Sequence, residues 1–431
     1  MNKKKHTNKN KTYENKTYKK KINENKKNEK VNKSKIHIKN TQKNKIKINK
    51  KNKSLKGGVF IGKGSYGCVV KPALPCINSK NNTKKFKSYV SKIIIDPSQD
   101  DEKDEFIISN KLKEVDSNQD HFITFESYCN IKKIPSNRSN TVSVDYIDNS
   151  LDSHEIIGDK IYDKKYCPID LKLKPVNLIM PYAGYDLLNI IKNKSHKQDL
   201  EHYILTKKML VKNFKLCFKN LLIGLLKMHN IRIVNRDIKN ENIMVNYNEN
   251  TQKTDMRFID FGLSTLIPLN YKKLKYIDYR GSEGMLAPEI IISFDINAGE
   301  SYKNTMKNIV KNIKNVIKSL KDYNILIKGF NTLIKELYSK IQKDFENNTI
   351  FDKYFGVDTT INSGKFNGYL QKGDIYSLGI TIINFLNYYN KKHKYKIVCN
   401  HIMHDLLQNM IHPDPEKRFN VIQCLKHKYF L

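Results

Sequence analysis

Several features that are common in proteins are scarce in this chain, and each scarcity excludes a class of protein. The 7 cysteines are odd in number, scattered and without CxxC spacing, which argues against a disulfide framework or a zinc site and favours a reducing compartment. Neither a signal peptide nor an apolar run long enough to cross a bilayer is evident. We therefore expect a soluble, intracellular protein that does not enter a membrane.

Acidic residues are also scarce. The chain has 43 Asp and Glu against 79 Lys and Arg, and its formal net charge is +36. Residues 1–56 hold 22 Lys and 3 Glu, hence +19 of that charge, with hardly an apolar cluster. We expect a disordered Lys/Asn-rich tail, whose charge suits nucleic acid or another polyanion. Because Trp is absent and Lys and Asn are abundant throughout, the bias of an AT-rich genome is an alternative explanation of the tail.

Three short strings follow one another in the second half of the chain. They are NRDIKNEN at 235–242, IDFG at 259–262 and MLAPE at 285–289. In this order they resemble the catalytic loop, the metal-binding segment and the end of the activation segment of eukaryotic-type protein kinases. Three such strings in one order leave little room for coincidence.

The resemblance implies a role for several residues of these strings. Asp237 would accept the proton of a substrate hydroxyl, and Lys239 would contact the transferred phosphate. Asn242 and Asp260 would bind Mg²⁺. Lys239, two positions after Asp237, is the form usual in serine/threonine kinases, so the resemblance favours serine/threonine specificity. Phosphoryl transfer needs cations and ordered donors around the transferred oxygens, and these residue types supply them.

A glycine-rich segment lies upstream, at residues 61–71. Its GxGxxG pattern also opens dinucleotide-binding folds, where a helix follows the last glycine. Here the run Cys68-Val69-Val70 leads into Pro72, which suits a strand. We therefore expect a hairpin whose backbone amides donate to nucleotide phosphates. The nucleotide-binding residues expected in it are Ile61, Gly62, Gly64, Gly67 and Val69.

An apolar run at residues 89–95 resembles the third strand of kinases, and Lys92 stands at the position of the lysine that contacts the α and β phosphates. Its ion-pair partner should be a carboxylate on the following helix. Glu105 fits best, because Ile108 and Leu112 follow it at the spacing of a buried helix face. Glu102 stays open as the alternative.

Residues 178–184, an apolar strand that ends in Pro, Ala and Gly, resemble the kinase hinge whose backbone bonds adenine. Met180 would be the gatekeeper and Tyr182 would lie against the nucleotide. The alternative is an ordinary edge strand and turn without a role in binding.

The resemblance covers the chain from about residue 56 onward and implies an α+β, bilobal protein-kinase fold. A small antiparallel-sheet lobe with one helix is expected at 57–180, and a larger, mainly helical lobe at 184–431. Residues 130–172 are expected to form a polar loop. An insertion at about 291–370 is expected to be helical, from apolar residues spaced as Ile309 and Ile313 are.

The implied function is transfer of the γ-phosphate of Mg-ATP to Ser and Thr hydroxyls of protein substrates, with ATP in the cleft between the lobes. With the composition, the motifs resemble kinases of giant DNA viruses or of protists with AT-rich genomes, and composition does not choose between these. The host cytoplasm, the nucleus and, for a viral protein, the virion stay open as locations. A pseudokinase scaffold and a nucleic-acid-binding protein that acts through the basic tail stay open as alternative functions.

Other positions carry structural expectations or depart from the family pattern. Asp374 should brace the catalytic loop, and Arg418 should form a buried ion pair with Glu289. Asn235 replaces the His that usually precedes Arg-Asp. Further departures are Ser91 in place of an Ala near adenine, Glu283 in place of a Pro before Ala-Pro-Glu, and Asp278 at the usual position of an activating phosphothreonine, with Arg236 as its partner.

Overall fold

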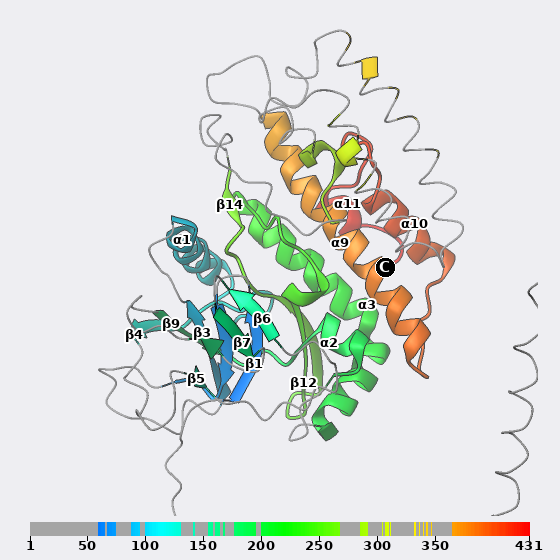
Figure 1. Ribbon diagram of the computed structural model, residues 1–431. Coiled ribbons are helices and arrows are strands. Elements are labelled where there is room, and N and C mark those ends of the chain that lie inside the picture. The colour runs from blue at the N-terminus through cyan, green and yellow to red at the C-terminus, as the bar shows by residue number, and fades with distance from the viewer. Residues whose placement is uncertain are drawn as a thin grey trace, which may run out of the picture. The chain divides into compact units, whose positions relative to one another are not determined.

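The computed structural model describes residues 59–64, 67–74, 88–94, 100–130, 141–142, 154–157, 160–163, 167–168, 176–194, 200–267, 285–291, isolated positions between 304 and 346, and 364–431. The tail at 1–56 lies outside these residues, so its disorder stays a prediction. Residues Leu55–Leu431 form one compact unit. Figure 1 shows the sheet and α1 of this unit on one side and its long helices on the other.

A five-stranded antiparallel sheet forms the small lobe, in the order β1-β2-β3-β9-β4. Its strands are β1 Val59–Gly64, β2 Gly67–Lys71, β3 Tyr89–Ile94, β4 Ser127–Asn130 and β9 Val176–Pro181. The strands are rich in Val and Ile, which pack well on a pleated surface. The hairpin of β1 and β2 pairs Gly64 with Gly67, so a strand and not a helix follows the glycines, as predicted.

One helix, α1 (Asp100–Val115), accompanies this sheet. Its residues Ile108 and Leu112 are buried, as the spacing predicted. The Phe106 ring lies 4.9 Å from the ring of Phe125 in an edge-to-face contact, which anchors the helix beside the sheet. The helix thereby presents one fixed face to β3.

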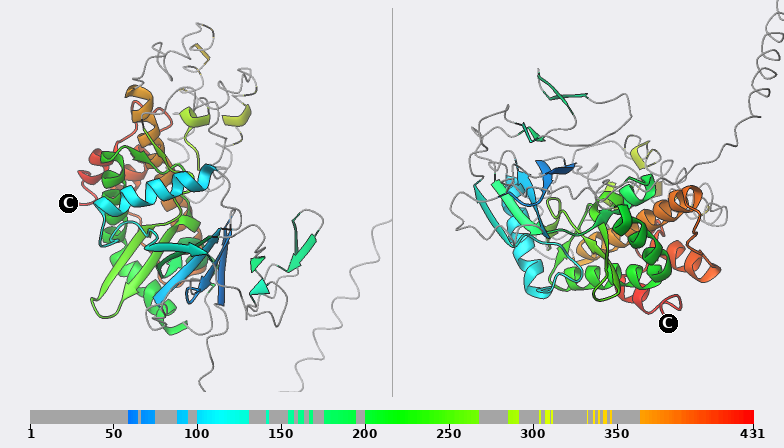
Figure 2. Two further views of the ribbon diagram at one scale, coloured as in Figure 1. Left: turned by 90° about the vertical axis from the view of Figure 1, so that its left-hand side faces the viewer. Right: turned by 90° about the horizontal axis from the view of Figure 1, so that it is seen from below.

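The segment between β4 and β9 was expected to be a loop, but the structure places two short antiparallel pairs in it. They are β5 Thr141–Val142 with β8 Cys167–Pro168, and β6 His154–Ile157 with β7 Lys160–Asp163. Figure 2 shows both pairs standing off the five-stranded sheet. The overall polarity of the segment concealed the β-branched residues Ile156, Ile157 and Ile161, which favour strand pairing.

The large lobe is mainly helical, as predicted. Its helices are α2 Leu187–Lys192, α3 Leu200–Asn230, η4 Asn240–Asn242, α9 Gly364–Lys392, α10 His401–Met410 and α11 Val421–Leu425. Its strands are β10 Tyr185–Asp186, β11 Ile233–Val234, β12 Ile243–Asn248, β13 Lys253–Phe258 and β14 Thr265–Leu266. The described positions between 304 and 346 are helical, and Ile309 is buried. Ile313 lies outside the described residues.

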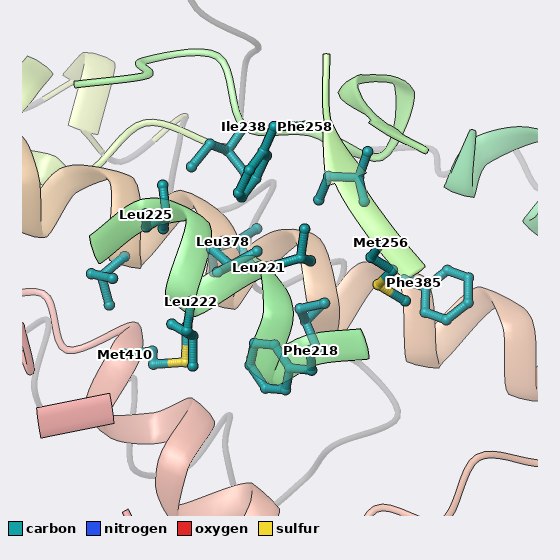
Figure 3. Close-up of a cluster of buried hydrophobic side chains, with 14 of the residues drawn as sticks. Phe218, Leu221, Leu222, Leu225, Ile238, Met256, Phe258, Leu378, Phe385 and Met410 are labelled. Carbon is teal, nitrogen blue, oxygen red and sulfur yellow. The ribbon is translucent and has the colours of Figure 1, made fainter. Parts of the chain in front are cut away.

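The core of this lobe forms around α3, whose apolar residues recur at helical spacing and face two layers. Figure 3 shows Phe218, Leu221, Leu222 and Leu225 of α3 between side chains of β13 and of α9 and α10. The facing side chains are Met256, Phe258, Leu378, Phe385 and Met410. Because α9 and β13 pack on the same helix, Asp374 within α9 and Asp260 just after β13 are held in place relative to each other.

The cysteines contradict one expectation. Cys68 of β2 and Cys129 of β4 are each disulfide-bonded, and β3 and β9 lie between their two strands, whereas Cys217, Cys399 and Cys424 are free thiols. The argument against disulfides was therefore wrong for these two residues. It rested on the spacing of cysteines along the chain, and spacing does not show which sulfur atoms the fold brings together. None of the described helices is both long and apolar enough to span a bilayer.

Candidate active site

The catalytic-loop string lies between β11 and β12 and includes η4, where Asp237 is held by two neighbours. Lys239 Nζ is 2.7 Å from Asp237 Oδ2, and Asn242 Nδ2 donates to the same oxygen at 2.7 Å. Asn242 Nδ2 also donates to the Asp237 carbonyl at 3.0 Å. The three residues therefore form one connected group around a carboxylate that is 8% exposed.

The backbone before Asp237 is braced from α9, as the sequence predicted for Asp374. The Asp374 carboxylate accepts from the amides of Asn235 at 2.8 Å and of Arg236 at 2.9 Å. Arg236 has a φ of +69°, a left-handed conformation that costs energy in a residue with a Cβ. The bonds to Asp374 offset this cost. His229, which sequence reasoning missed, adds a hydrogen bond to Asp374 at 3.0 Å.

Asn235 also acts within the loop. Its side-chain Oδ1 accepts from the amide of Asp237 at 3.0 Å, and its carbonyl accepts from the Ser264 hydroxyl at 3.2 Å. Asn235 is 2% exposed. The residue that departs from the family pattern is thus a buried link between the Asp237 backbone and the segment after Asp260.

Lys92 of the small lobe contacts Asp260 of the string IDFG at 259–262. Its Nζ lies 2.8 Å from Asp260 Oδ1 and 2.8 Å from Glu105 Oε1. Strand β3, helix α1 and the segment after β13 therefore meet at one ammonium group. Of the two predicted partners, Glu105 is the one that the structure places at Lys92, whereas the side chain of Glu102 lies outside the described residues. Asp260 has a φ of +61°, which turns the chain directly after β13.

The charges of this group shift one another's pKa values. Burial alone would lower the pKa of Lys92, but the carboxylates of Asp260 and Glu105 outweigh burial and raise this pKa above its ordinary value. Lys92 in turn is the main cause that lowers the pKa of Asp260. Burial raises the pKa of Asp237 against the opposing effect of Lys239, and the charge of Asp260 raises it further. Asp260 is therefore anionic at neutral pH, and Asp237 is a stronger base than an exposed carboxylate.

The glycine-rich hairpin lies beside Lys92 in the sheet. Val69 of β2 is paired directly with Lys92 of β3, and Ile61 lies in β1 at a shift in the pairing register. Gly62 and Gly64 lie in β1, and Gly67 begins β2. The structure thus brings the expected nucleotide-binding residues of the hairpin onto the strands next to Lys92.

The hinge string leaves β9 after Pro181. Met180 pairs with Val90 of β3, and the Tyr182 amide donates to the Ser88 carbonyl at 2.9 Å. The Lys71 ammonium lies 3.5 Å from the centre of the Tyr182 ring. Gly184 has a φ of +91°, and a Cβ there would lie 2.1 Å from the Val245 carbonyl oxygen, so this turn requires glycine.

Asp186 follows the hinge, and the sequence marked it only as the start of a helix and not as a site residue. Its carboxylate accepts from the Asn189 amide at 2.7 Å and caps α2. Burial raises its pKa to about 6, and the charge of Glu241 adds to this rise. The order Asp-Leu-Leu-Asn is a recognisable helix start. Nothing in it indicated that Glu241 of the catalytic loop lies near the Asp186 carboxylate.

The remaining predicted positions have mixed outcomes. Arg418 Nη2 lies 3.0 Å from Glu289 Oε2, and both side chains are about 1% exposed or less, so the predicted ion pair is present. The Ser91 hydroxyl accepts from the Leu74 amide at 2.7 Å. Glu283 and Asp278 lie outside the described residues.

Comparison with known proteins agrees with this geometry. Residues 175–309 match the protein kinase domain. The nitrogen permease reactivator protein of Saccharomyces cerevisiae is 28% identical over 116 residues, which is 26% of this chain and 12% of that protein. The probable serine/threonine-protein kinase fhkB of Dictyostelium discoideum is 32% identical over 114 residues, 26% of this chain and 8% of that protein.

A third relative is the serine/threonine-protein kinase oca2 of Schizosaccharomyces pombe, 28% identical over 116 residues, 26% of this chain and 15% of that protein. The alignments therefore cover a small part of each of these relatives. The described part of the chain has a small antiparallel sheet with one helix and a larger, mainly helical lobe, which agrees with the bilobal fold expected from the sequence. Over residues 175–309 the chain is therefore similar to protein kinases.

Proposed function

We propose that this chain is an active kinase that transfers the γ-phosphate of Mg-ATP to Ser and Thr hydroxyls of protein substrates. One observation carries the proposal: Lys92 contacts both Asp260 and Glu105 at 2.8 Å, next to a group formed by Asp237, Lys239 and Asn242. Phosphoryl transfer depends on such a juxtaposition of cations and carboxylates, because the reaction needs positioning and charge stabilisation more than covalent chemistry.

The small lobe supplies the ATP-binding groups in this proposal. Lys92 binds the α and β phosphates, and the backbone of Gly62, Gly64 and Gly67 covers them. Ile61, Val69 and Met180 enclose the adenine with apolar surface. In the hinge, the Tyr182 amide is occupied by Ser88, so the next amide, that of Ala183, is the better candidate donor to adenine.

The donor set fits Mg²⁺. Asp260 offers an anionic carboxylate, as its lowered pKa indicates, and Mg²⁺ prefers such hard oxygen ligands. Asn242 uses its Nδ2 to hold Asp237, so its Oδ1 is the atom left for a cation. When bound, Mg²⁺ would neutralise charge on the phosphates of ATP.

Asp237 and Lys239 act at the substrate. Asp237 orients the attacking hydroxyl and accepts its proton, a role that its raised pKa favours. Lys239, 2.7 Å from Asp237, then stabilises the negative charge of the transferred group. Serine/threonine specificity rests on Lys239 in the family pattern and agrees with the names of two relatives.

The test is transfer of labelled phosphate from ATP, with Mg²⁺, to a generic basic protein by the purified full chain. Asp237→Asn is the matched control, because it keeps size and hydrogen-bonding capacity but removes the base. Transfer by the wild type alone supports the proposal, and phosphoamino-acid analysis then distinguishes Ser/Thr from Tyr. A folded wild type with no transfer above the control would favour the pseudokinase alternative, to which the replacement of the usual His by Asn235 points.

A further inference from the structure

A cluster of cations lies on the large lobe away from the candidate active site. The connection from α9 to α10 has the sequence KKHKYKIV at 391–398, which we call the basic loop. Lys391, Lys392, Lys394 and Lys396 are exposed. The chain has no acidic residue between Asp374 and Asp405, so this stretch of the sequence is strongly basic.

The basic loop has a defined conformation. The Asn390 side chain accepts from the Ile397 amide at 2.9 Å and donates to the Ile397 carbonyl at 2.9 Å. The Ile397 side chain is buried, and the His393 ring stacks on Tyr389 with centroids 4.2 Å apart. The lysines between these anchors are therefore presented from a fixed turn, and ordering them costs less entropy on binding than ordering a free tail does.

Lysines from two other elements lie near the basic loop. His393 Nε2 lies 3.1 Å from the Ile190 carbonyl of α2. Two exposed lysines lie close to Ile190 in sequence, namely Lys192, which ends α2, and Lys194. Lys207 of α3 donates to Asn193 at 2.6 Å. Burial, and then the charge of Lys207, lower the pKa of His393, which places Lys207 near the loop. Three segments that are far apart in sequence thus contribute cations to one region.

Apolar surface is exposed among these cations. Tyr395 is 65% exposed and Val398 is 81% exposed. An aromatic ring among lysines provides a face on which a base can stack, while the ammonium groups contact phosphates. Duplexes hide the faces of their bases inside the stack, whereas single strands offer them.

We propose that the basic loop, with Lys192, Lys194 and Lys207, is a docking surface for single-stranded nucleic acid. The phosphates lie along the lysines, and a base stacks on Tyr395. This surface is distinct from the basic tail, and it does not depend on the kinase chemistry proposed above.

The test measures fluorescence anisotropy of a labelled oligothymidine with the full-length chain over a range of NaCl concentrations. The loop variant is Lys392→Gln/Lys394→Gln/Lys396→Gln. Its matched control is Lys212→Gln/Lys215→Gln/Lys426→Gln, three exposed lysines on α3 and at the end of α11. Both variants lose the same charge and keep the tail.

We expect the loop variant to reduce the slope of log affinity against log salt by about 2, since each lysine contact to a single strand contributes about 0.7. The control variant and a charge-preserving Lys392→Arg/Lys394→Arg/Lys396→Arg variant should keep the wild-type slope. Equal affinity and slope for the loop and control variants would overturn the proposal, because the tail would then carry all binding.

A second comparison tests stacking. Tyr395→Ala should weaken oligothymidine binding about fivefold or more, whereas Tyr128→Ala, which removes a ring that is 63% exposed in the small lobe, should not. This comparison leaves all charges in place. It therefore also tests whether the basic loop binds the single strand if the triple Gln variant does not fold. Equal losses for the two Tyr variants would count against stacking at the loop.

Vesicles containing phosphatidylserine form the last arm. If the loop variant loses binding to these vesicles while its oligothymidine binding is unchanged, the surface recognises lipid and the proposal is wrong. Phosphate transfer to the basic protein is measured on the same variants and should be unchanged, so a failure of this proposal is distinguishable from a failure of the proposed kinase function.

Discussion

At the scale of single residues, Asn235 shows how a departure from a family pattern can be compensated. Its Oδ1 accepts the Asp237 amide at 3.0 Å, its own amide donates to Asp374, and its carbonyl accepts from Ser264. Each bond holds one end of the short segment that carries Asp237. The side chain therefore positions Asp237 through its backbone rather than through contact with substrate.

We expect Asn235→Ala to lower kcat about tenfold and to leave KM for ATP unchanged, because the buried Asp237 amide loses its acceptor. Asn240→Ala is the matched control, since Asn240 lies in the same loop and its buried Oδ1 has no partner among the described residues. Steady-state kinetics with the basic-protein substrate measure both. A similar fall in kcat for the two variants would contradict the prediction, because any side-chain truncation in this loop would then lower kcat.

At the scale of elements, the ends of helices and the segments between them carry the features that decide the site. Arg418 lies between α10 and α11, and Glu289 lies in the described segment 285–291. The Arg418 guanidinium also donates to the carbonyls of His412, Lys372 and Pro413. One buried cation thus ties together three parts of the large lobe.

Arg418→Met should lower the free energy of unfolding by about 3–5 kcal/mol, because it leaves the Glu289 charge buried without its partner. Adding Glu289→Leu should recover part of this loss, since the pair is then replaced by apolar groups. Urea unfolding measures both variants beside Lys417→Met, an exposed neighbour. An Arg418→Met protein as stable as Lys417→Met would contradict the buried ion pair.

Asp186, at the start of α2, gives a prediction for pH. Its pKa is about 6 in the folded protein, raised from 3.8 chiefly by burial. The folded state therefore binds more protons than the unfolded state between about pH 4 and 6, so this group contributes stability at low pH that is lost as the pH rises through 6. The loss amounts to at most about 3 kcal/mol.

Asp186→Asn should flatten this part of the curve of unfolding free energy against pH, since Asn does not titrate. Denaturant unfolding at a series of pH values between 4 and 7 measures the effect. Glu201→Gln, which changes an exposed carboxylate of α3, should leave the slope as in the wild type. If Asp186→Asn also leaves it unchanged, the raised pKa is refuted.

At the scale of the whole molecule, the proposed function requires that ligand binding stabilise the fold. Saturating Mg-ATP at about 100 times its Kd should add about 2.7 kcal/mol to the free energy of unfolding. The melting temperature should therefore rise by a few degrees. Because Asp260 supplies a proposed Mg²⁺ ligand and also contacts Lys92, Asp260→Asn should remove the part of this shift that depends on Mg²⁺.

Differential scanning fluorimetry with ATP, with Mg²⁺ and with both measures the shift. EDTA should reverse the Mg²⁺-dependent part in the wild type. A wild-type protein whose melting temperature does not respond to any of these additions would contradict nucleotide binding and, with it, the proposed activity.

The sequence alone predicted much of this molecule, because several of its motifs are short, contiguous strings whose chemistry is local. The order of Asp237, Lys239 and Asn242, the strand around Lys92 and the helical spacing around Glu105 could all be read without coordinates. The two short strand pairs between β4 and β9 were missed because the overall polarity of that segment concealed its β-branched residues. The disulfide-bonded state of Cys68 and Cys129 was missed because the spacing of cysteines along the chain does not show which sulfur atoms meet in the fold.

The amino-acid sequence by itself determined which residue types stand ready for phosphate chemistry, since a carboxylate, an amide or an ammonium group is fixed by residue identity. Only the tertiary structure decided that Lys92 contacts Asp260 as well as its predicted partner Glu105, that His229 joins the predicted bracing residue Asp374, and that Lys207 lies near the basic loop. The contact of Lys92 with Asp260 joins residues 168 positions apart. Such contacts arise from the packing of β3, α1, α3 and α9, which no local pattern encodes.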